Sequence, residues 1–232
     1  MFRPPFRDRL DGAERLADAL AHVGGLEGGI VLGVPRGGVP VAAVVARRLG
    51  LPLDVIVAHK VGAPFQPELA IAAVVADGTT VIEPWAVEEL GVEKAALAAA
   101  VAAEIERARA REQRFRAGRP PLALAGRPVV IVDDGIATGA TVHAAVLAVR
   151  AAGASRVVVA APVGAVDTVA RLGRVADAVV VPEQPDPFHA VGLWYARFDP
   201  VDDAEVAELL GAGATRGSAG PRAGEPTGPA SR

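Results

Sequence analysis

The chain has 232 residues, of which 51% are hydrophobic but only 4% aromatic, so Val, Leu, Ile and Ala must build its core. The absence of cysteine excludes disulfides and thiol chemistry, and a net charge of −3 without a basic block argues against nucleic-acid binding. Charges recur through residues 1–10 and no apolar run approaches a membrane span, so we expect a cytoplasmic protein without a signal peptide.

Short aliphatic runs and amphipathic stretches alternate along the chain. The first predicted element is an amphipathic helix over residues 7–23, with Leu10, Leu16 and Leu20 among its apolar positions. The later predicted elements, in chain order, are a strand at 30–34, a helix at 41–49, a strand at 55–58, a hairpin of 70–75 with 80–82, a helix from Glu88 or Glu93 to Ala117, a strand at 129–132, a helix ending at Ala152, a strand at 156–161, a helix at 165–172 and a strand at 178–181. This alternation predicts an α/β fold with a mainly parallel, twisted sheet flanked by helices.

The long helix that ends at Ala117 has a charged surface. Opposite charges three or four residues apart predict ion pairs between Glu104 and Arg107, Glu106 and Arg109, and Glu112 and Arg116. We interpret the arginines of this helix as a solvated face rather than a phosphate clamp; they are Arg107, Arg109, Arg111, Arg114 and Arg116.

The segment 129–141 is the most informative about function. Its aliphatic run suits a buried parallel strand and ends in Asp133 and Asp134, at the edge where open α/β sheets bind ligands. The next turn exposes backbone N–H groups at a helix N-terminus and adds two hydroxyls, which suits a phosphate monoester. This turn consists of Ala137, Thr138, Gly139, Ala140 and Thr141. The pattern indicates a sugar-phosphate site; the alternative is an ordinary strand–loop–helix with a solvated acidic pair.

The strand, the two acids and the Thr-Gly-x-Thr turn resemble the phosphoribosyl-pyrophosphate (PRPP) binding motif of the type I phosphoribosyltransferases. The resemblance implies that family's fold, with a small C-terminal hood, and homodimers. It further implies that Asp133 and Asp134 hold the ribose 2′- and 3′-hydroxyls, directly or through Mg²⁺, while the turn binds the 5′-phosphate. The implied activity is Mg²⁺-dependent transfer of the 5-phosphoribosyl group to a nitrogenous acceptor, typically a nucleobase, with release of pyrophosphate.

A second turn, Pro35-Arg36-Gly37-Gly38, follows the first predicted strand. Its glycines permit close backbone approach and Arg36 supplies a cation, both of which suit a pyrophosphate. The turn resembles the pyrophosphate loop of the same family, which implies a non-proline cis peptide at or beside Arg36–Gly37 and contacts of Arg36, Gly37 and Gly38 with the leaving group. The alternative is a plain Gly-Gly turn with a solvated Arg36.

His59 and Lys60 follow the strand predicted at 55–58. In the family a basic residue at this place reaches the pyrophosphate, and the next segment closes over the site. The resemblance therefore implies the first role for Lys60, and a lid or a substrate-facing loop for residues 62–69. The alternative for Lys60 is a solvated strand end.

The C-terminal part holds several of the few aromatic residues. Its Pro-Asp-x-Phe sequence, which ends at Phe188, resembles the hood of hypoxanthine–guanine phosphoribosyltransferases, and this implies that Phe188 stacks on the acceptor, with Trp194 also in the acceptor site. The alternative is that Phe188, Trp194, Tyr195 and Phe198 form a satellite core. The predicted organisation is a core at 1–181, a hood at 182–210 and a disordered tail at 211–232.

Two departures from the oxopurine enzymes leave the acceptor open. Those enzymes carry an Asp where this chain has Ala137, and a Lys after the strand predicted at 156–161, where this chain continues Pro-Val-Gly-Ala. Proton removal would need another group, such as Glu68 or Asp186. Two other functions are also compatible with the motif: a PRPP-binding regulator without turnover, and a hydrolase of another phosphosugar, against which the Arg36-Gly37-Gly38 loop argues.

Overall fold

Five parallel strands form the central sheet, in the order β2-β1-β6-β7-β8. The computed structural model describes residues 4–64 and 66–217. The strands of this sheet are β1 (Ile30–Gly33), β2 (Leu53–Val55), β6 (Pro128–Val132), β7 (Arg156–Ala160) and β8 (Ala178–Val180). Because the central strands are buried on both faces, they read as continuous β-branched runs. The predicted α/β fold with a parallel sheet is confirmed.

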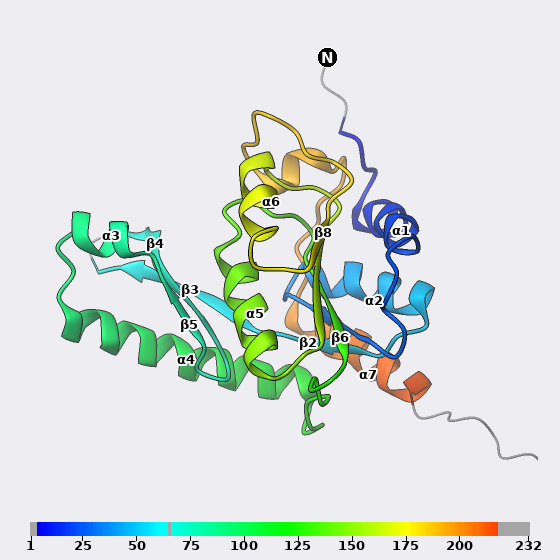
Figure 1. The fold of residues 1–232 in the computed structure, drawn as a ribbon, viewed down its shortest axis with the longest axis horizontal. Coiled ribbons are helices and arrows are strands. Elements are labelled where there is room, and N and C mark those ends of the chain that lie inside the picture. The colour runs from blue at the N-terminus through cyan, green and yellow to red at the C-terminus, as the bar shows by residue number, and fades with distance from the viewer. Residues whose placement is uncertain (1–3, 65, 218–232) are drawn as a thin grey trace, which may run out of the picture.

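Helices cover both faces of this sheet (Figure 1). They are α1 (Arg9–Leu20), α2 (Gly38–Leu49), α5 (Ala140–Ala151), α6 (Val166–Leu172) and α7 (Asp203–Gly217). Alternate residues of β6 serve opposite faces, as the pleat of a strand requires. Val130 and Val132 pack in the cluster that contains α1, α2 and α7, while Val129 and Ile131 pack in the cluster that contains α5.

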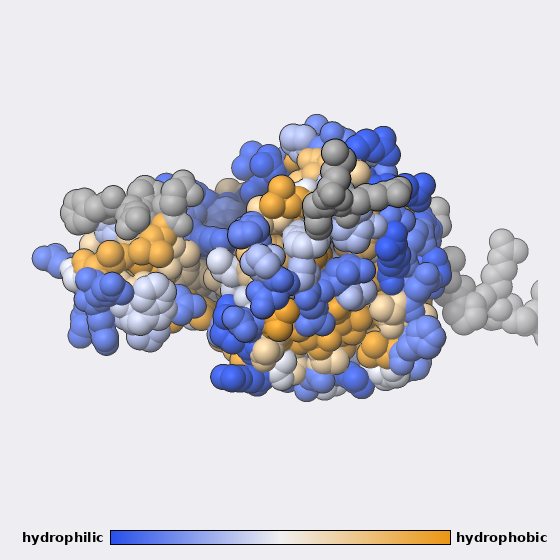
Figure 2. Space-filling view, turned by 90° about the horizontal axis from the view of Figure 1, so that it is seen from above, coloured by the Kyte–Doolittle hydropathy of each residue, from blue (hydrophilic) through white to orange (hydrophobic). Residues whose placement is uncertain are grey.

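A second, antiparallel sheet extends from the main body as an arm (Figure 1). The arm consists of β3 (Ala58–Ala63), β4 (Gln66–Val75), β5 (Thr80–Ile82), α3 (Pro84–Glu89) and α4 (Lys94–Arg116). The predicted hairpin is confirmed as β4 paired with β5. The arm has its own small core around Ile71 and Val74, and it exposes Ile82, Trp85 and Leu90. Figure 2 shows hydrophobic surface on this part of the molecule.

The strand predicted at 55–58 is wrong, because the chain leaves the central sheet and enters the arm within these residues. β2 ends at Val55 in the central sheet and β3 begins at Ala58 in the arm, so no single strand spans the segment. The loop predicted at 62–69 is also wrong. β3 continues to Ala63 and pairs there with Gln66 at the start of β4.

The disordered tail predicted from residue 211 is wrong at its start. Helix α7 continues to Gly217, and its buried residues Val206 and Leu210 join the core that contains α2. That packing anchors the helix up to the glycine at 211, where the sequence pattern alone suggested an end. The rest of the predicted tail, 218–232, lies outside the described residues.

Two predictions about helix surfaces need correction. Leu10 was expected on the apolar side of α1 but is 57% exposed, whereas Leu16 and Leu20 are buried as expected. The three ion pairs predicted along α4 are present. However, Arg116 is not on a solvated face: its side chain is 13% exposed and pairs with the buried Asp54 of β2. No helix in the described part of the chain is long and apolar enough to cross a membrane.

Candidate functional site

The acidic pair stands at the carboxyl end of β6, where the sequence placed it. The backbone N–H of Asp134 donates a hydrogen bond of 2.8 Å to Oδ1 of Asp133, so the two residues form a compact turn. The N–H of Asp133 donates to the carbonyl of Ala160 at the end of β7. Both acidic residues are half-buried. The sheet therefore fixes the backbone of both acids while part of each side chain still faces solvent.

The Pro35–Gly38 turn lies directly against the acidic pair. Gly33 of β1 is in register with Val132 of β6, so the chain leaves both strands at the same level. A Cβ atom built at Gly37 would lie 1.8 Å from Oδ2 of Asp134, and one built at Gly38 would lie 2.6 Å from the carbonyl oxygen of Val132. Glycine is therefore required at both positions, because any side chain would displace the turn or the acids.

The conformation of the same turn agrees with the resemblance. The peptide bond between Pro35 and Arg36 is cis, one bond before Arg36–Gly37. The Arg36 side chain is exposed and forms no ion pair within residues 4–64 and 66–217. An exposed cation thus stands next to backbone that can approach a ligand closely.

The turn after the acids ends at the N-terminus of α5, as predicted. Gly139 precedes the helix in the left-handed conformation, with φ of 73°. The first hydrogen bond of this helix joins the N–H of His143 to the carbonyl of Gly139. The N–H groups of Ala140 and Thr141 consequently have no acceptor within the helix and can bind an anion. Thr138 is exposed and Thr141 half-buried, so both hydroxyls lie within reach of solvent.

Two residues of α6 donate hydrogen bonds to carbonyl oxygens of this turn, and the sequence did not indicate either of them. Oγ1 of Thr168 donates to the carbonyl of Ala137 at 2.8 Å, and Nη2 of Arg171 donates to the carbonyl of Thr138 at 3.1 Å. Arg171 also donates to Thr168. Because these bonds engage carbonyl oxygens, they leave the N–H groups of the turn available to a ligand.

Arg9 is a further residue that sequence reasoning missed. Its Nε donates to Oδ2 of Asp134 at 2.8 Å, and both side chains are largely buried, at 15% and 14% exposed. The ion pair brings α1 to the acidic turn across 125 positions of sequence. Because the two residues are so far apart in the chain, the sequence around Arg9 does not identify Asp134 as its partner.

Burial dominates the electrostatics of the acidic pair. It raises the pKa of Asp133 well above its ordinary value, and repulsion from Asp134 adds to the rise. Burial also raises the pKa of Asp134, although Arg9 opposes this effect. Two desolvated carboxylates side by side favour binding of a cation or of hydroxyl donors.

The donor set also fits Mg²⁺, which takes carboxylate oxygens and usually keeps several water or substrate ligands. One oxygen of each acid accepts a bond from a protein N–H group, namely Oδ1 of Asp133 and Oδ2 of Asp134. Within the described ranges no group of three or more His, Cys, Asp or Glu could hold a metal alone. A metal bound by the acidic pair would take its other ligands from water or from a substrate.

The part of the predicted hood that precedes α7 packs on the acidic turn. The hydroxyl of Tyr195 donates to the backbone carbonyl of Asp134 at 2.5 Å, and burial raises the pKa of this phenol, so it stays a donor. Val191 fills the space next to Gly135, where a Cβ would lie 2.3 Å from its Cγ1. Gly135 therefore lets the hood approach the backbone of the site.

The aromatic residues of the hood pack together, as the satellite-core interpretation expected. Tyr195 is buried with Phe6 and Val163, and Phe188, Trp194 and Phe198 pack against this cluster. The rings of Phe188 and Trp194 are stacked, 6.1 Å between centroids and 19° between planes. Both rings are half-buried, so the acceptor role of Phe188 and Trp194 stays a prediction.

Neither Lys60 nor Asp186 forms a hydrogen bond or ion pair with the acidic pair within the described residues. Lys60 is exposed within β3, opposite Ala73 of β4, and does not stand at the end of a central strand. The prediction had assumed that the second strand of the central sheet ran up to this residue. Of the two candidate bases, Asp186 is exposed in the hood, and the side chain of Glu68 lies outside the described part.

Comparisons with known proteins identify the family of the chain. The family model of the phosphoribosyl transferase domain matches residues 10–190. A protein of Mycobacterium tuberculosis H37Rv, named as a phosphoribosyl transferase, is 45% identical over 205 residues. The match covers 88% of this chain but 46% of that protein, so the chain spans about half the length of the curated relatives it matches.

A solved structure extends the comparison to three dimensions. The crystal structure of TT1426 from Thermus thermophilus is 45% identical to this chain and superposes with a TM-score of 0.76. The match covers 88% of this chain and 97% of the other. The family model and this similarity lead to the same conclusion: the chain belongs to the phosphoribosyl transferase family.

Proposed function

We propose that the chain transfers the 5-phosphoribosyl group of PRPP to a nitrogenous acceptor, typically a nucleobase, in a Mg²⁺-dependent reaction that releases pyrophosphate. The observation that carries the proposal is the contact of Gly37 and Gly38 with Asp133 and Asp134. A site for one phosphate would need only the turn before α5. The second glycine turn, with the exposed cation of Arg36, supplies the place for a pyrophosphate beside the ribose.

In this proposal each part of PRPP meets one part of the site. The 5′-phosphate binds the N–H groups and hydroxyls of the turn formed by Ala137, Thr138, Gly139, Ala140 and Thr141. The ribose hydroxyls bind Asp133 and Asp134, and the pyrophosphate binds Arg36 and the backbone of Gly37 and Gly38. Mg²⁺, held by the acidic pair and by substrate oxygens, would neutralise the charge of the leaving group.

The contribution of the protein is positioning and electrostatic stabilisation. Displacement at the anomeric carbon moves negative charge onto the departing pyrophosphate, and Arg36 is placed to stabilise that charge. The carboxylates hold the ribose at a fixed orientation relative to the phosphate turn, because both leave the same strand, β6. Lys60 lies in β3 of the arm instead of at the end of a central strand, and we keep it as a second candidate cation for the pyrophosphate.

We further propose that the acceptor binds between the donor site and the hood, with Phe188 and Trp194 as its aromatic contacts. The active form is proposed to be a homodimer. Ala137 cannot remove a proton, so the acceptor would need a base elsewhere or would have to arrive deprotonated. Because Ala137 provides no base, a second function is also a candidate: a PRPP-binding regulator without turnover.

Calorimetric titration with PRPP and Mg²⁺, followed by a panel of nucleobases with pyrophosphate detection, tests the proposal. We expect binding, followed by pyrophosphate release with one base. Binding without release by any base would favour the regulator. The variant Asp133→Asn/Asp134→Asn should bind no PRPP while it retains the circular dichroism of the wild type. Undiminished binding by this variant would refute the assignment of the site.

A further inference from the structure

Arg9 belongs to the N-terminal helix, yet its guanidinium group lies between the acidic pair and the hood. In addition to the ion pair with Asp134, its Nη1 donates to the carbonyl of Asp199 at 2.6 Å. The guanidinium carbon lies 3.7 Å from the centre of the Phe198 ring. One side chain therefore contacts the proposed donor site on one side and two hood residues on the other.

The orientation of the Asp134 carboxylate depends on this contact. Its Oδ2 accepts from Arg9 and lies against Gly37, where an added Cβ would be 1.8 Å away. The same added Cβ would lie 3.2 Å from Nε of Arg9, so all three residues meet at one point. Arg9 thus holds Asp134 against the turn that we assign to pyrophosphate.

The contacts of Arg9 with the hood lead back to Asp134. Phe198, beneath the guanidinium, stacks on Tyr195 with 5.0 Å between ring centroids. The hydroxyl of Tyr195 donates to the carbonyl of Asp134, and Asp134 accepts from Arg9. The hood therefore contacts Asp134 in two ways, at the backbone carbonyl through Tyr195 and at the carboxylate through Arg9.

We propose that Arg9 is a positioning residue for the PRPP site. It fixes the carboxylate of Asp134 against Gly37 and connects that carboxylate to the hood. The inference rests on the proposed function, because it assumes that Asp134 faces the ribose of PRPP. Hydrogen bonds to charged groups contribute enough that loss of this one should weaken binding of Mg²⁺–PRPP by about tenfold or more.

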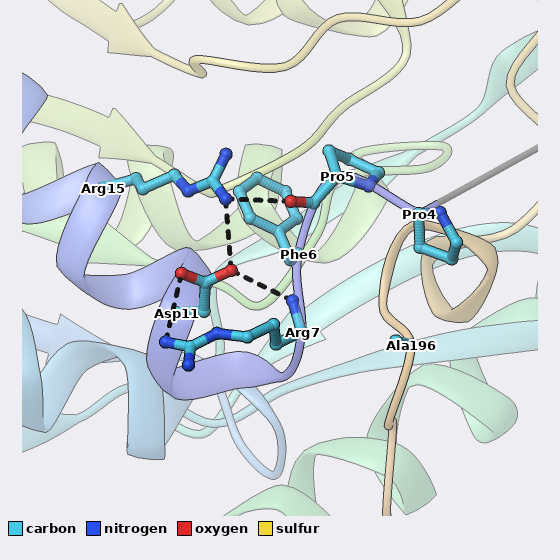
Figure 3. Close-up of a pocket in the computed structure, with 7 residues that line it drawn as sticks. All are labelled: Pro4, Pro5, Phe6, Arg7, Asp11, Arg15 and Ala196. Carbon is cyan, nitrogen blue, oxygen red and sulfur yellow. Dashed lines mark hydrogen bonds and ion pairs between the residues drawn. The ribbon is translucent and has the colours of Figure 1, made fainter.

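Arg15 provides a matched control on the same helix. It lines a cavity of about 520 Å³. Figure 3 shows its ion pair with Asp11 and its hydrogen bond to the carbonyl of Pro5. Its guanidinium carbon lies 5.2 Å from the centre of the Phe6 ring. Arg15 therefore has the same three kinds of partner as Arg9, a carboxylate, a carbonyl oxygen and an aromatic ring, but none of them is in the acidic pair.

The experiment is calorimetry with Mg²⁺–PRPP on the full chain and on Arg9→Gln, Arg9→Lys and Arg15→Gln. We expect Arg9→Gln to lose about tenfold or more in affinity and Arg9→Lys to recover part of it, since Lys keeps the charge. Arg15→Gln should bind as the wild type does. Thermal unfolding of each variant shows whether it is folded at the temperature of the titration.

A double-mutant cycle separates positioning from general stability. If Arg9 acts through Asp134, Arg9→Gln should cost less than about threefold when Asp134→Asn is already present. Equal losses in both backgrounds, or wild-type affinity of Arg9→Gln, would overturn the proposal while the proposed function stood. Absence of PRPP binding by the unmodified chain would overturn both.

Discussion

The carboxylate of Asp134 rests on the backbone of Gly37, so closely that a methyl group at Gly37 would lie 1.8 Å from Oδ2. Two segments that are separate in sequence thereby form one surface, on which a sugar and a pyrophosphate could lie side by side. The first prediction follows from this contact.

Gly37→Ala should weaken Mg²⁺–PRPP binding by at least about tenfold, because the new methyl group must displace either the Asp134 carboxylate or the turn. Gly24→Ala is the control, since nothing lies within 4 Å of a Cβ at Gly24. Calorimetry on the two variants checks the prediction. Equal affinities would show that the contact is irrelevant to the ligand.

Arg36→Ala should weaken PRPP far more than ribose 5-phosphate, because only PRPP carries the pyrophosphate assigned to Arg36. Competition of both ligands against the same site measures the ratio of the two losses. An equal loss for both ligands would remove Arg36 from the pyrophosphate role.

Thr138→Val should weaken PRPP and ribose 5-phosphate by similar factors, because both carry the 5′-phosphate and the hydroxyl is replaced by a methyl group. Direct titration of each ligand into the variant provides the comparison. A loss restricted to PRPP would contradict the assignment of the turn before α5.

Asp54→Ala should lower the free energy of unfolding by about 3–5 kcal/mol, the usual cost of breaking a buried ion pair. Asp54 accepts from Arg116 of α4 and from the N–H of Leu122, so the substitution removes one acceptor from each of two partly buried donors. Glu106→Ala, which removes an exposed pair with Arg109, should cost about 1 kcal/mol or less. Urea denaturation measures both, and similar losses would contradict the structural role of Asp54.

Asp177 should contribute to the pH dependence of stability. Its carboxylate accepts from the N–H of Val157 at 2.7 Å, and this bond, together with Arg150, lowers its pKa below the ordinary value. A pKa that is lower in the folded state means that stabilisation is present above the unfolded pKa, about 3.9, and is lost as pH falls through the folded pKa.

Asp177→Asn should therefore be less stable than the wild type at neutral pH and approach it below about pH 4. Unfolding free energies of both proteins between pH 7 and pH 3 test this. A difference that stays constant over the whole range would show that the charge of Asp177 is not responsible.

Most of the central sheet was predictable because each strand is a short β-branched run bounded by polar residues. The exception is the run around 55–58, where β2 and β3 meet. Both strands bury aliphatic side chains, so composition does not reveal that the chain passes from one sheet to another. The position of Lys60 was wrong for the same reason.

The acids and the two glycine-containing turns were predictable because each is a continuous segment with its own local chemistry. Arg9, Thr168 and Arg171 were not, since their partners are distant in sequence. One feature pointed to Arg9. It starts a helical stripe whose other members are apolar, and those members, Ala13, Leu16, Ala17 and Leu20, are buried. A charged residue on such a stripe needs a buried partner.

The acids directly follow β6, which lies between β1 and β7, and this position has a consequence for local unfolding. β6 pairs with a strand on each side and is covered on both faces. β5 in the arm, in contrast, is an edge strand with partly exposed residues. Amide hydrogens of β6 should therefore exchange with solvent only when the whole domain opens, and those of β5 much sooner. The arm can then fray without loosening the backbone that holds the acids.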